Sequence, residues 1–263
     1  RTAGQKYLSE AVSPLGATLV RYLFAAPFVV IYVVWLLDDR NTSLPQPNDT
    51  FLIAGLLAAV LQIVATVMLV RLFTLRNFAV GSCYIRTEVL ATAVLGLAFF
   101  GEQVSLVGWV AMLICVVGLV MITIAKSGRL AELWNVSAAY GLIAGVSLSL
   151  TSLFIRQASL SFGLDDALFT AALTLGYMIF IQTVICLVLL LVQNAAELLV
   201  IFQKWKVSLF IGVTSLLGSI GWFTAFTLER AAYVKTLGQI EFLFTLVIAV
   251  IFFREIPSRL EWL

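Results

Sequence analysis

Long apolar runs fill most of the chain, and short polar connectors separate them. About 20 consecutive apolar residues cross a bilayer as an α-helix, and runs without strict alternation favour helices over strands. The runs predict eight complete membrane-spanning helices, at residues 14–37, 50–74, 78–100, 104–125, 135–158, 167–193, 205–228 and 232–253. We therefore expect an all-α fold, a polytopic transmembrane helix bundle.

Composition agrees with a lipid environment. The chain is 62% hydrophobic and 11% charged, whereas a soluble domain carries about 25% charged residues. The net charge of +2 is spread thinly along the chain, so we expect no nucleic-acid partner. The connectors are too short to fold into a soluble domain, and the longest, 38–49, has the Pro, Asn and Asp residues of a loop. We expect a multi-pass protein of the cell (inner) membrane that acts within the bilayer.

The residue types also restrict the chemistry. The chain contains no histidine, which removes imidazole bases, Ser-His-Asp triads and most zinc sites. Cys83, Cys115 and Cys186 lie inside apolar runs without a paired spacing, which favours buried thiols over disulfides or metal ligands. We therefore expect no enzyme, no cofactor and no bound metal.

The chain resembles itself at a constant offset. Residues 73–109 match residues 226–262 without gaps at 13 of 37 positions, where shared apolar composition would give roughly 3. The matched pairs that apolar composition does not explain are Glu88 with Glu241, Glu102 with Glu255 and Trp109 with Trp262. We interpret this match as an internal duplication.

The two copies are expected to cross the membrane in opposite directions. The second copy lies five spans after the first, and an odd number of crossings reverses the direction of the chain. Inverted repeats are typical of secondary transporters, because two alike but oppositely facing units can open a central site alternately to each side.

Basic connectors indicate an orientation. Alternating the connectors between the two sides places 10 Lys or Arg residues on one face and 4 on the other. The positive-inside rule makes the first face cytoplasmic. The second face carries Arg40, Arg156, Arg230 and Lys235.

Two acidic residues lie near the centres of predicted spans, Glu88 in 78–100 and Glu241 in 232–253. A charged group at the bilayer centre costs about 2.5–3.5 kcal/mol, so such groups face the bundle interior or a water-filled cavity. Helical spacing places Tyr84, Glu88 and Thr92 on one stripe, and Gln239 adds a polar group beside Glu241. The two stripes are predicted to flank one cavity.

Other polar and aromatic residues are further candidates for substrate binding or coupling. Arg86 lies about 200° around the helix from Glu88, so its partner should lie on another helix. Arg21 in the first span and Gln62 in the second could bind substrate. Tyr177 and Trp222 could supply aromatic walls, although packing or interface anchoring explains them equally well.

A static core remains an alternative for the charged residues. Glu88 and Arg86 could form a permanent interhelical ion pair, or a protonated Glu88 could act as a hydrogen-bonded staple. For Glu102, which follows the paired phenylalanines at the end of its span, a helix-start or connector-shaping role is favoured.

Three segments resemble the EamA-like branch of the drug/metabolite transporter superfamily. The segments "FFGEQVSLVGWVAMLICVVGLVMI" and "FFREIPSRLEWL" are similar to its repeated helix–connector–helix signature, which contains a Glu, and "SPLGATLVRYLFAAPF" resembles the start of its second helix. The second copy departs from the signature, since Arg254 stands where the first copy has Gly101.

The resemblance implies ten helices in two inverted five-helix repeats. Residues 1–126 would then be a first EamA-like repeat without its first helix, and residues 135–263 a second repeat with a truncated last helix, so the chain would be a fragment. Family members are drawn with both termini cytoplasmic, which is opposite to the charge count above.

These observations converge on a secondary transporter. The expected function is movement of small metabolites or amino acids, outward by alternating access, with protons as a candidate coupling ion. The lipid bilayer and a small-molecule substrate are the expected partners. A non-transporting membrane scaffold or receptor with a static polar core is the alternative.

Overall fold

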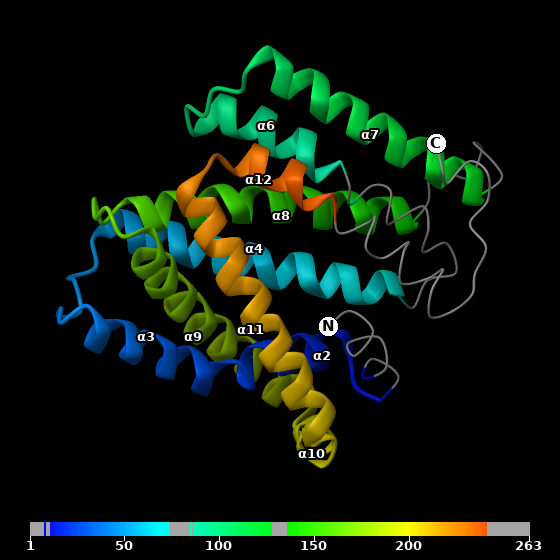
Figure 1. Ribbon diagram of the computed structural model, residues 1–263. Helices are drawn as coiled ribbons and strands as arrows, with labels where there is room; N and C mark the ends of the chain where they lie inside the picture. The colour runs from blue at the N-terminus through cyan, green and yellow to red at the C-terminus, as the bar shows by residue number, and fades with distance from the viewer. Residues whose placement is uncertain (1–7, 9–10, 74–84, 86, 128–135, 241–263) are drawn as a thin grey trace.

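The computed structural model describes residues 8, 11–73, 85, 87–127 and 136–240, and every regular element in them is a helix. The helices are α2 (Pro14–Leu23), α3 (Ala26–Asp39), α4 (Asp49–Phe73), α6 (Glu88–Phe99), α7 (Leu106–Ser127), α8 (Val136–Leu160), α9 (Ala167–Asn194), α10 (Ala196–Gln203), α11 (Trp205–Leu228) and α12 (Ala231–Gly238). Figure 1 shows them as one bundle. The predicted all-α class is confirmed.

Within the described part of the chain, five helical stretches are long and apolar enough to cross a membrane. They are Pro14–Asp39, Asp49–Leu72, Val136–Leu160, Ala167–Asn194 and Trp205–Leu228, and they coincide with five of the eight predicted spans. Helices α6, α7 and α12 overlap the other three predicted spans, 78–100, 104–125 and 232–253. Much of the first and the last of these spans lies outside the described residues.

The first predicted span is not one straight helix. It bends at Phe24 and Ala25, between α2 and α3. Proline at position 27 has no backbone N–H and its ring collides with the carbonyl four residues earlier, which interrupts the helical ladder at Leu23. The amide of Ala25 instead donates to the carbonyl of Tyr22, three residues back, at 3.1 Å.

Helix α9 occupies the middle of the bundle and contacts α2, α3, α4, α8 and α11. Helix α8 lies along α4 (Figure 1), where the small side chains of Ala54 and Ala158 are buried together with Phe51. Lipid tails are as apolar as the side chains, so no hydrophobic effect drives the helices together. Small residues stabilise the contact instead, because they let the helix backbones approach closely. The core is therefore assembled from alanines and branched aliphatic side chains between helices.

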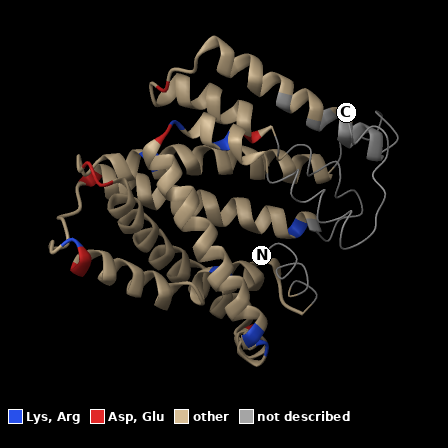
Figure 2. Ribbon diagram, in the orientation of Figure 1, with Lys and Arg blue, Asp and Glu red and all other residues tan. Residues whose placement is uncertain are grey.

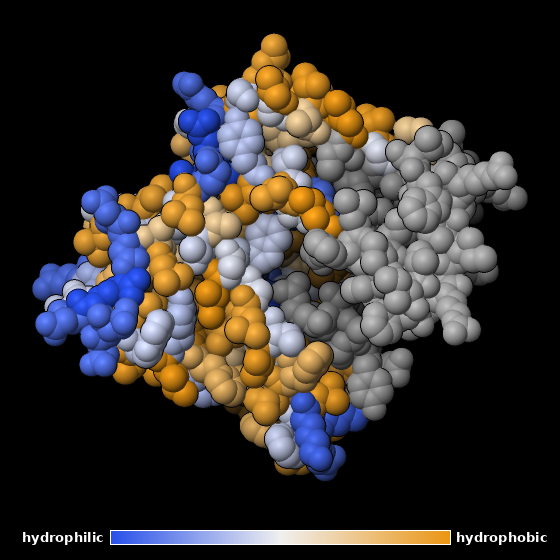
Figure 3. All heavy atoms as spheres, viewed as in Figure 1, coloured by the Kyte–Doolittle hydropathy of each residue, from blue (hydrophilic) through white to orange (hydrophobic). Residues whose placement is uncertain are grey.

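The outer surface matches a lipid environment. Large apolar side chains such as Ile31, Val192 and Leu217 are more than half exposed on the flanks of the helices, and Figure 3 shows these flanks as mainly apolar. Charged residues gather at the helix ends, as Figure 2 shows for the connectors at the left of the view. A soluble protein would not expose so much apolar surface, and this multi-pass membrane protein buries it in the bilayer.

Candidate functional site

The central feature of the bundle is a buried ion pair between α6 and α12. Lys235 Nζ donates to Glu88 Oε2 at 3.1 Å, and both residues are less than a tenth exposed. The two residues are 147 positions apart in the sequence. Glu88 stands in the first turn of α6, where the positive end of the helix dipole adds to the attraction for a carboxylate.

Two aromatic rings of α11 cover the ammonium group. Lys235 Nζ lies 5.5 Å from the ring centroid of Trp222 and 5.7 Å from that of Phe226. Such distances are within the range of cation–π attraction. Gly238 lets α12 approach this wall, because a β-carbon there would collide with the Trp222 ring. The pair is therefore enclosed by α6, α11 and α12.

Hydroxyl groups hold the backbone of Glu88. Thr92 Oγ1 donates to the Glu88 carbonyl oxygen at 2.6 Å, and Ser149 Oγ of α8 lies 2.8 Å from the same oxygen. Gln239 is also buried, and its amide Nε2 lies 3.3 Å from the carbonyl oxygen of Lys235. Of the predicted stripe, Glu88 and Thr92 are both buried, and the Thr92 hydroxyl is used by the helix backbone.

A second polar cluster lies where α2, α4, α9 and α11 meet. Arg21, Gln62, Gln182, Ser215 and Ser219 line one small pocket there. Gln182 Nε2 donates to Gln62 Oε1 at 2.7 Å and lies 3.3 Å from the carbonyl oxygen of Ala59. Arg21 is 9% exposed and its guanidinium lies 5.6 Å from the centroid of the Tyr22 ring.

The bend between α2 and α3 positions this cluster. Arg21 occupies the last turn of α2, and Ala25 at the bend lines the same pocket. On α11, Gly212 faces the bend so closely that a β-carbon would lie 2.5 Å from Phe24 Cβ and 2.8 Å from its carbonyl carbon. Ser215 and Ser219 follow Gly212 at helical spacing, so α11 turns one small-residue face toward Arg21.

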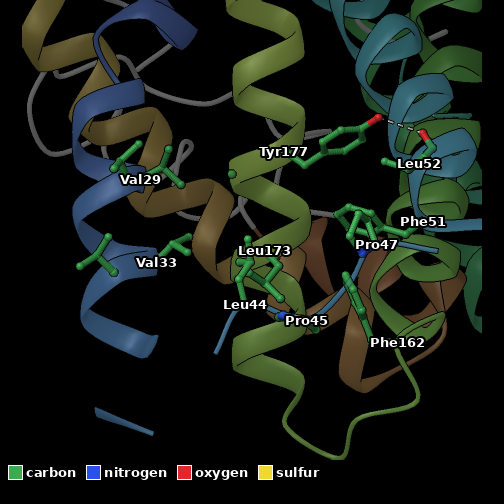
Figure 4. A pocket seen from close by; sticks show the side chains of 13 residues that line it. Val29, Val33, Leu44, Pro45, Pro47, Phe51, Leu52, Phe162, Leu173 and Tyr177 are labelled. Carbon is green, nitrogen blue, oxygen red and sulfur yellow. Dashed lines mark hydrogen bonds between the residues drawn. The ribbon is translucent and has the colours of Figure 1, made fainter. Parts of the chain in front are cut away.

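Tyr177 lies elsewhere, in an apolar groove between α3, α4 and α9 (Figure 4). The groove has a volume of about 410 Å³, and Val29, Val33, Phe51 and Leu173 are among its lining residues. The Tyr177 hydroxyl donates to the carbonyl oxygen of Leu52 at 3.2 Å, as the dashed line in Figure 4 marks. Tyr177 therefore lines this apolar groove and lies apart from both polar clusters.

A polar cavity of about 650 Å³ opens at the end of the bundle where α6 and α8 finish. Glu102 Oε1 accepts from Arg156 Nε at 3.1 Å, and Arg156 Nη1 also donates to the carbonyls of Phe226, Thr227 and Glu229 at the end of α11. Burial raises the pKa of the Glu102 carboxyl, and the charge of Arg156 partly offsets this. The contacts agree with a connector-shaping role for Glu102.

The predicted site residues thus divide into three groups. Glu88, Trp222 and Gln239 contact Lys235, and Thr92 bonds to the backbone of Glu88. Arg21 and Gln62 share the second cluster, and Tyr177 lies apart. The predicted residues Tyr84, Arg86 and Glu241 lie outside the described residues.

Lys235 was missed by the sequence analysis, which assigned it to a connector. The structure buries it and pairs it with Glu88. Its position inside the predicted span 232–253 was the signal that could have identified it, since a lysine within a span requires a partner. Gln182 could have been identified in a similar way, because it is a polar residue in the middle of the predicted span 167–193.

Comparisons with known proteins agree with this architecture. Residues 2–124 match the model of the EamA-like transporter family, which confirms the resemblance to that family over this part of the chain. A solved structure, described only as a crystal structure of a protein, superposes with a TM-score of 0.68 at 14% identity, over 96% of this chain and 84% of that one. At that identity the likeness shows the fold alone. No curated protein matches the chain.

Proposed function

We propose that the protein is a secondary transporter that exports a small metabolite or amino acid across the cell (inner) membrane by alternating access. The match of residues 2–124 to the EamA-like transporter family supports this proposal. The observation that carries the proposal is the buried Glu88–Lys235 pair between two helices of the bundle. Ionisable groups inside a membrane are costly, and they mark the pathways of substrates and protons.

The directions of α6 and α12 support an inverted-repeat architecture, with units at 1–126 and 135–263. Phe100, at the end of α6, and Arg230, at the start of α12, line the same cavity. Glu88, at the start of α6, pairs with Lys235, further along α12. The two helices therefore run antiparallel, as two copies of one helix in inverted repeats must.

In this proposal the ion pair is the contact that opens and closes. A proton bound to the Glu88 carboxylate removes the attraction for Lys235, and the ammonium group is then left beside Trp222 and Phe226. Desolvated charges without partners are unfavourable, so α12 parts from α6 until water reaches the lysine. Release of the proton restores the pair and the closed packing, which couples proton movement to the exchange between two conformations.

The test is transport in vesicles that contain the purified protein. The vesicles are loaded with a defined mixture of the twenty amino acids and short-chain carboxylic acids, a pH gradient is imposed, and efflux is measured by mass spectrometry. We expect at least one solute to leave faster than from protein-free vesicles. Glu88→Gln should abolish the gradient dependence without preventing insertion, whereas the exposed Glu229→Gln should behave as the wild type. Gradient-driven efflux that survives Glu88→Gln would exclude the proposed coupling.

The completeness of the pair favours one alternative, a scaffold or receptor with a static core. Glu88 and Lys235 satisfy each other's charge inside the protein at 3.1 Å, as a purely structural pair would. The alternative predicts that no solute moves in the vesicle experiment, while substitution of either partner lowers stability.

A further inference from the structure

Arg21 is a buried charge that meets no opposite charge in the described part of the bundle. The side chain is 9% exposed, and no carboxylate lies within ion-pairing distance of it among the residues that the structure describes. The last turn of α2 offers only the partial negative charge of a helix C-terminus. A full positive charge in a low-dielectric interior requires a full negative charge nearby.

The neighbours of Arg21 are hydrogen-bond donors. The Ser215 hydroxyl is buried, 1% exposed, and in the described part of the structure its oxygen has no hydrogen-bond partner. Gln62 uses its amide oxygen to accept from Gln182, which leaves its own N–H groups for the pocket. A guanidinium, a hydroxyl and an amide whose residues line one pocket supply a set of donors that complements an anion.

The pocket is small. Its volume is about 10 Å³, which is close to the minimum for one water-sized group. One halide ion matches this space, and so does one oxygen atom of a carboxylate, which leaves a single further oxygen outside. A phosphate or sulfate would leave three further oxygens outside the pocket without these donors.

We propose that Arg21, Ser215 and Gln62 form a subsite for a single small anion, the carboxylate group of the transported solute. This inference deepens the proposed function. The binding of an anion does not depend on transport, but the assignment of that anion to a transported solute rests on the proposed function. The same donors would accept an inorganic anion such as chloride, so the experiment separates these two sources.

The experiment measures the unfolding temperature of the purified protein in detergent by the fluorescence of its 6 tryptophans. Sodium acetate, sodium chloride, sodium phosphate and the neutral analogue acetamide are titrated at an ionic strength held constant with a bulky sulfonate. For the wild type we expect a saturable rise in Tm with acetate, of about 5 °C at a hundredfold excess over its Kd, and no rise with acetamide or phosphate.

Variants assign the effect to the pocket. Arg21→Gln should abolish the response, and the exposed Arg71→Gln, its matched control, should retain it. Ser215→Ala, which removes one donor from a small buried site, should weaken acetate about tenfold. This variant tests the proposal even if Arg21→Gln fails to fold.

The outcomes separate the proposals. A response to acetate that exceeds that to chloride supports a carboxylate, and an equal or larger response to chloride supports the anion subsite with an inorganic occupant. A response shared by acetamide or phosphate, or one that persists in Arg21→Gln and Ser215→Ala, overturns the subsite. Acetate binding without solute efflux in vesicles would reject the proposed transport while the anion subsite stands.

Discussion

Two buried cations of this bundle have opposite surroundings. Lys235 lies 3.1 Å from the carboxylate of Glu88 and is covered by two aromatic rings. Arg21 is equally buried but faces hydroxyl and amide groups around a small pocket. The first charge is neutralised by the protein itself, whereas the second has no carboxylate partner among the described residues. The difference shows that burial alone does not require the fold to supply an ion pair, and it motivates the proposed anion subsite at Arg21.

The largest effect is expected from breaking the Glu88–Lys235 pair. Lys235→Met leaves a carboxylate buried without its partner and should lower the free energy of unfolding by about 3–5 kcal/mol. The double variant Glu88→Gln/Lys235→Met should recover most of this loss, because no charge is then stranded. Denaturant unfolding in detergent of the wild type, Glu88→Gln, Lys235→Met and the double variant measures the interaction energy between the two side chains. The exposed Lys206→Met serves as a control. A double variant as unstable as Lys235→Met would contradict the pairing.

The next largest effect is expected at Arg21, where removal of the charge should stabilise the protein rather than destabilise it. In anion-free buffer, Arg21→Met replaces an incompletely neutralised charge with a side chain of similar length and should raise the free energy of unfolding by about 1–3 kcal/mol. Arg71→Met, at the exposed end of α4, should change it little. The same unfolding measurement applies, and a large loss of stability in Arg21→Met would show that Arg21 is already neutralised within the protein.

Gly212→Ala tests whether close packing of α11 creates the Arg21 pocket. The added carbon would lie 2.5 Å from Phe24 Cβ and 2.8 Å from the Phe24 carbonyl carbon, so the two helices must separate, at a cost of about 1–3 kcal/mol. On the same helix, a β-carbon on Gly218 meets nothing within 4 Å, so Gly218→Ala is the matched control. If both variants unfold alike, the contact at the bend does not position the pocket.

The smallest effect is expected from an ion pair outside the spans. Arg40 donates to Asp166, and the two side chains are 27% and 37% exposed, so solvent screens their attraction. The hydrogen bond from Arg40 holds the pKa of Asp166 below its usual range. The carboxylate therefore stabilises the folded protein above its unfolded pKa of about 3.9, and this contribution is lost as the pH falls through the lowered value.

Asp166→Asn keeps an N-cap for α9 but removes the titrating group. Stability measured below about pH 4 should fall less steeply with decreasing pH in this variant than in the wild type. An unchanged pH profile would show that Arg40 and Asp166 contribute nothing to folding in solution.

The helical class and the positions of five spans were predictable because apolar runs report locally on the solvent around them. The presence of Glu88 and Arg21 in the interior was predictable for the same reason, since charges within a span must avoid lipid. The partner of Glu88 was not, because Lys235 stands early in its span and was read as part of a connector. The bend at Phe24 and Ala25, which Pro27 causes, was also missed. A single proline within a long apolar run hardly changes the hydropathy of that run.

The sequence by itself determined that this protein is a bundle of membrane-spanning helices with ionisable groups inside it, because hydropathy is a property of consecutive residues. Only the tertiary structure decided which of those groups meet. Glu88 and Lys235, 147 positions apart, come together through the packing of α6 on α12. Within the part of the chain that the structure describes, Arg21 meets no carboxylate, because α11 turns glycine and serine toward it. Contacts between helices depend on how whole helices are arranged, and no local pattern encodes that arrangement.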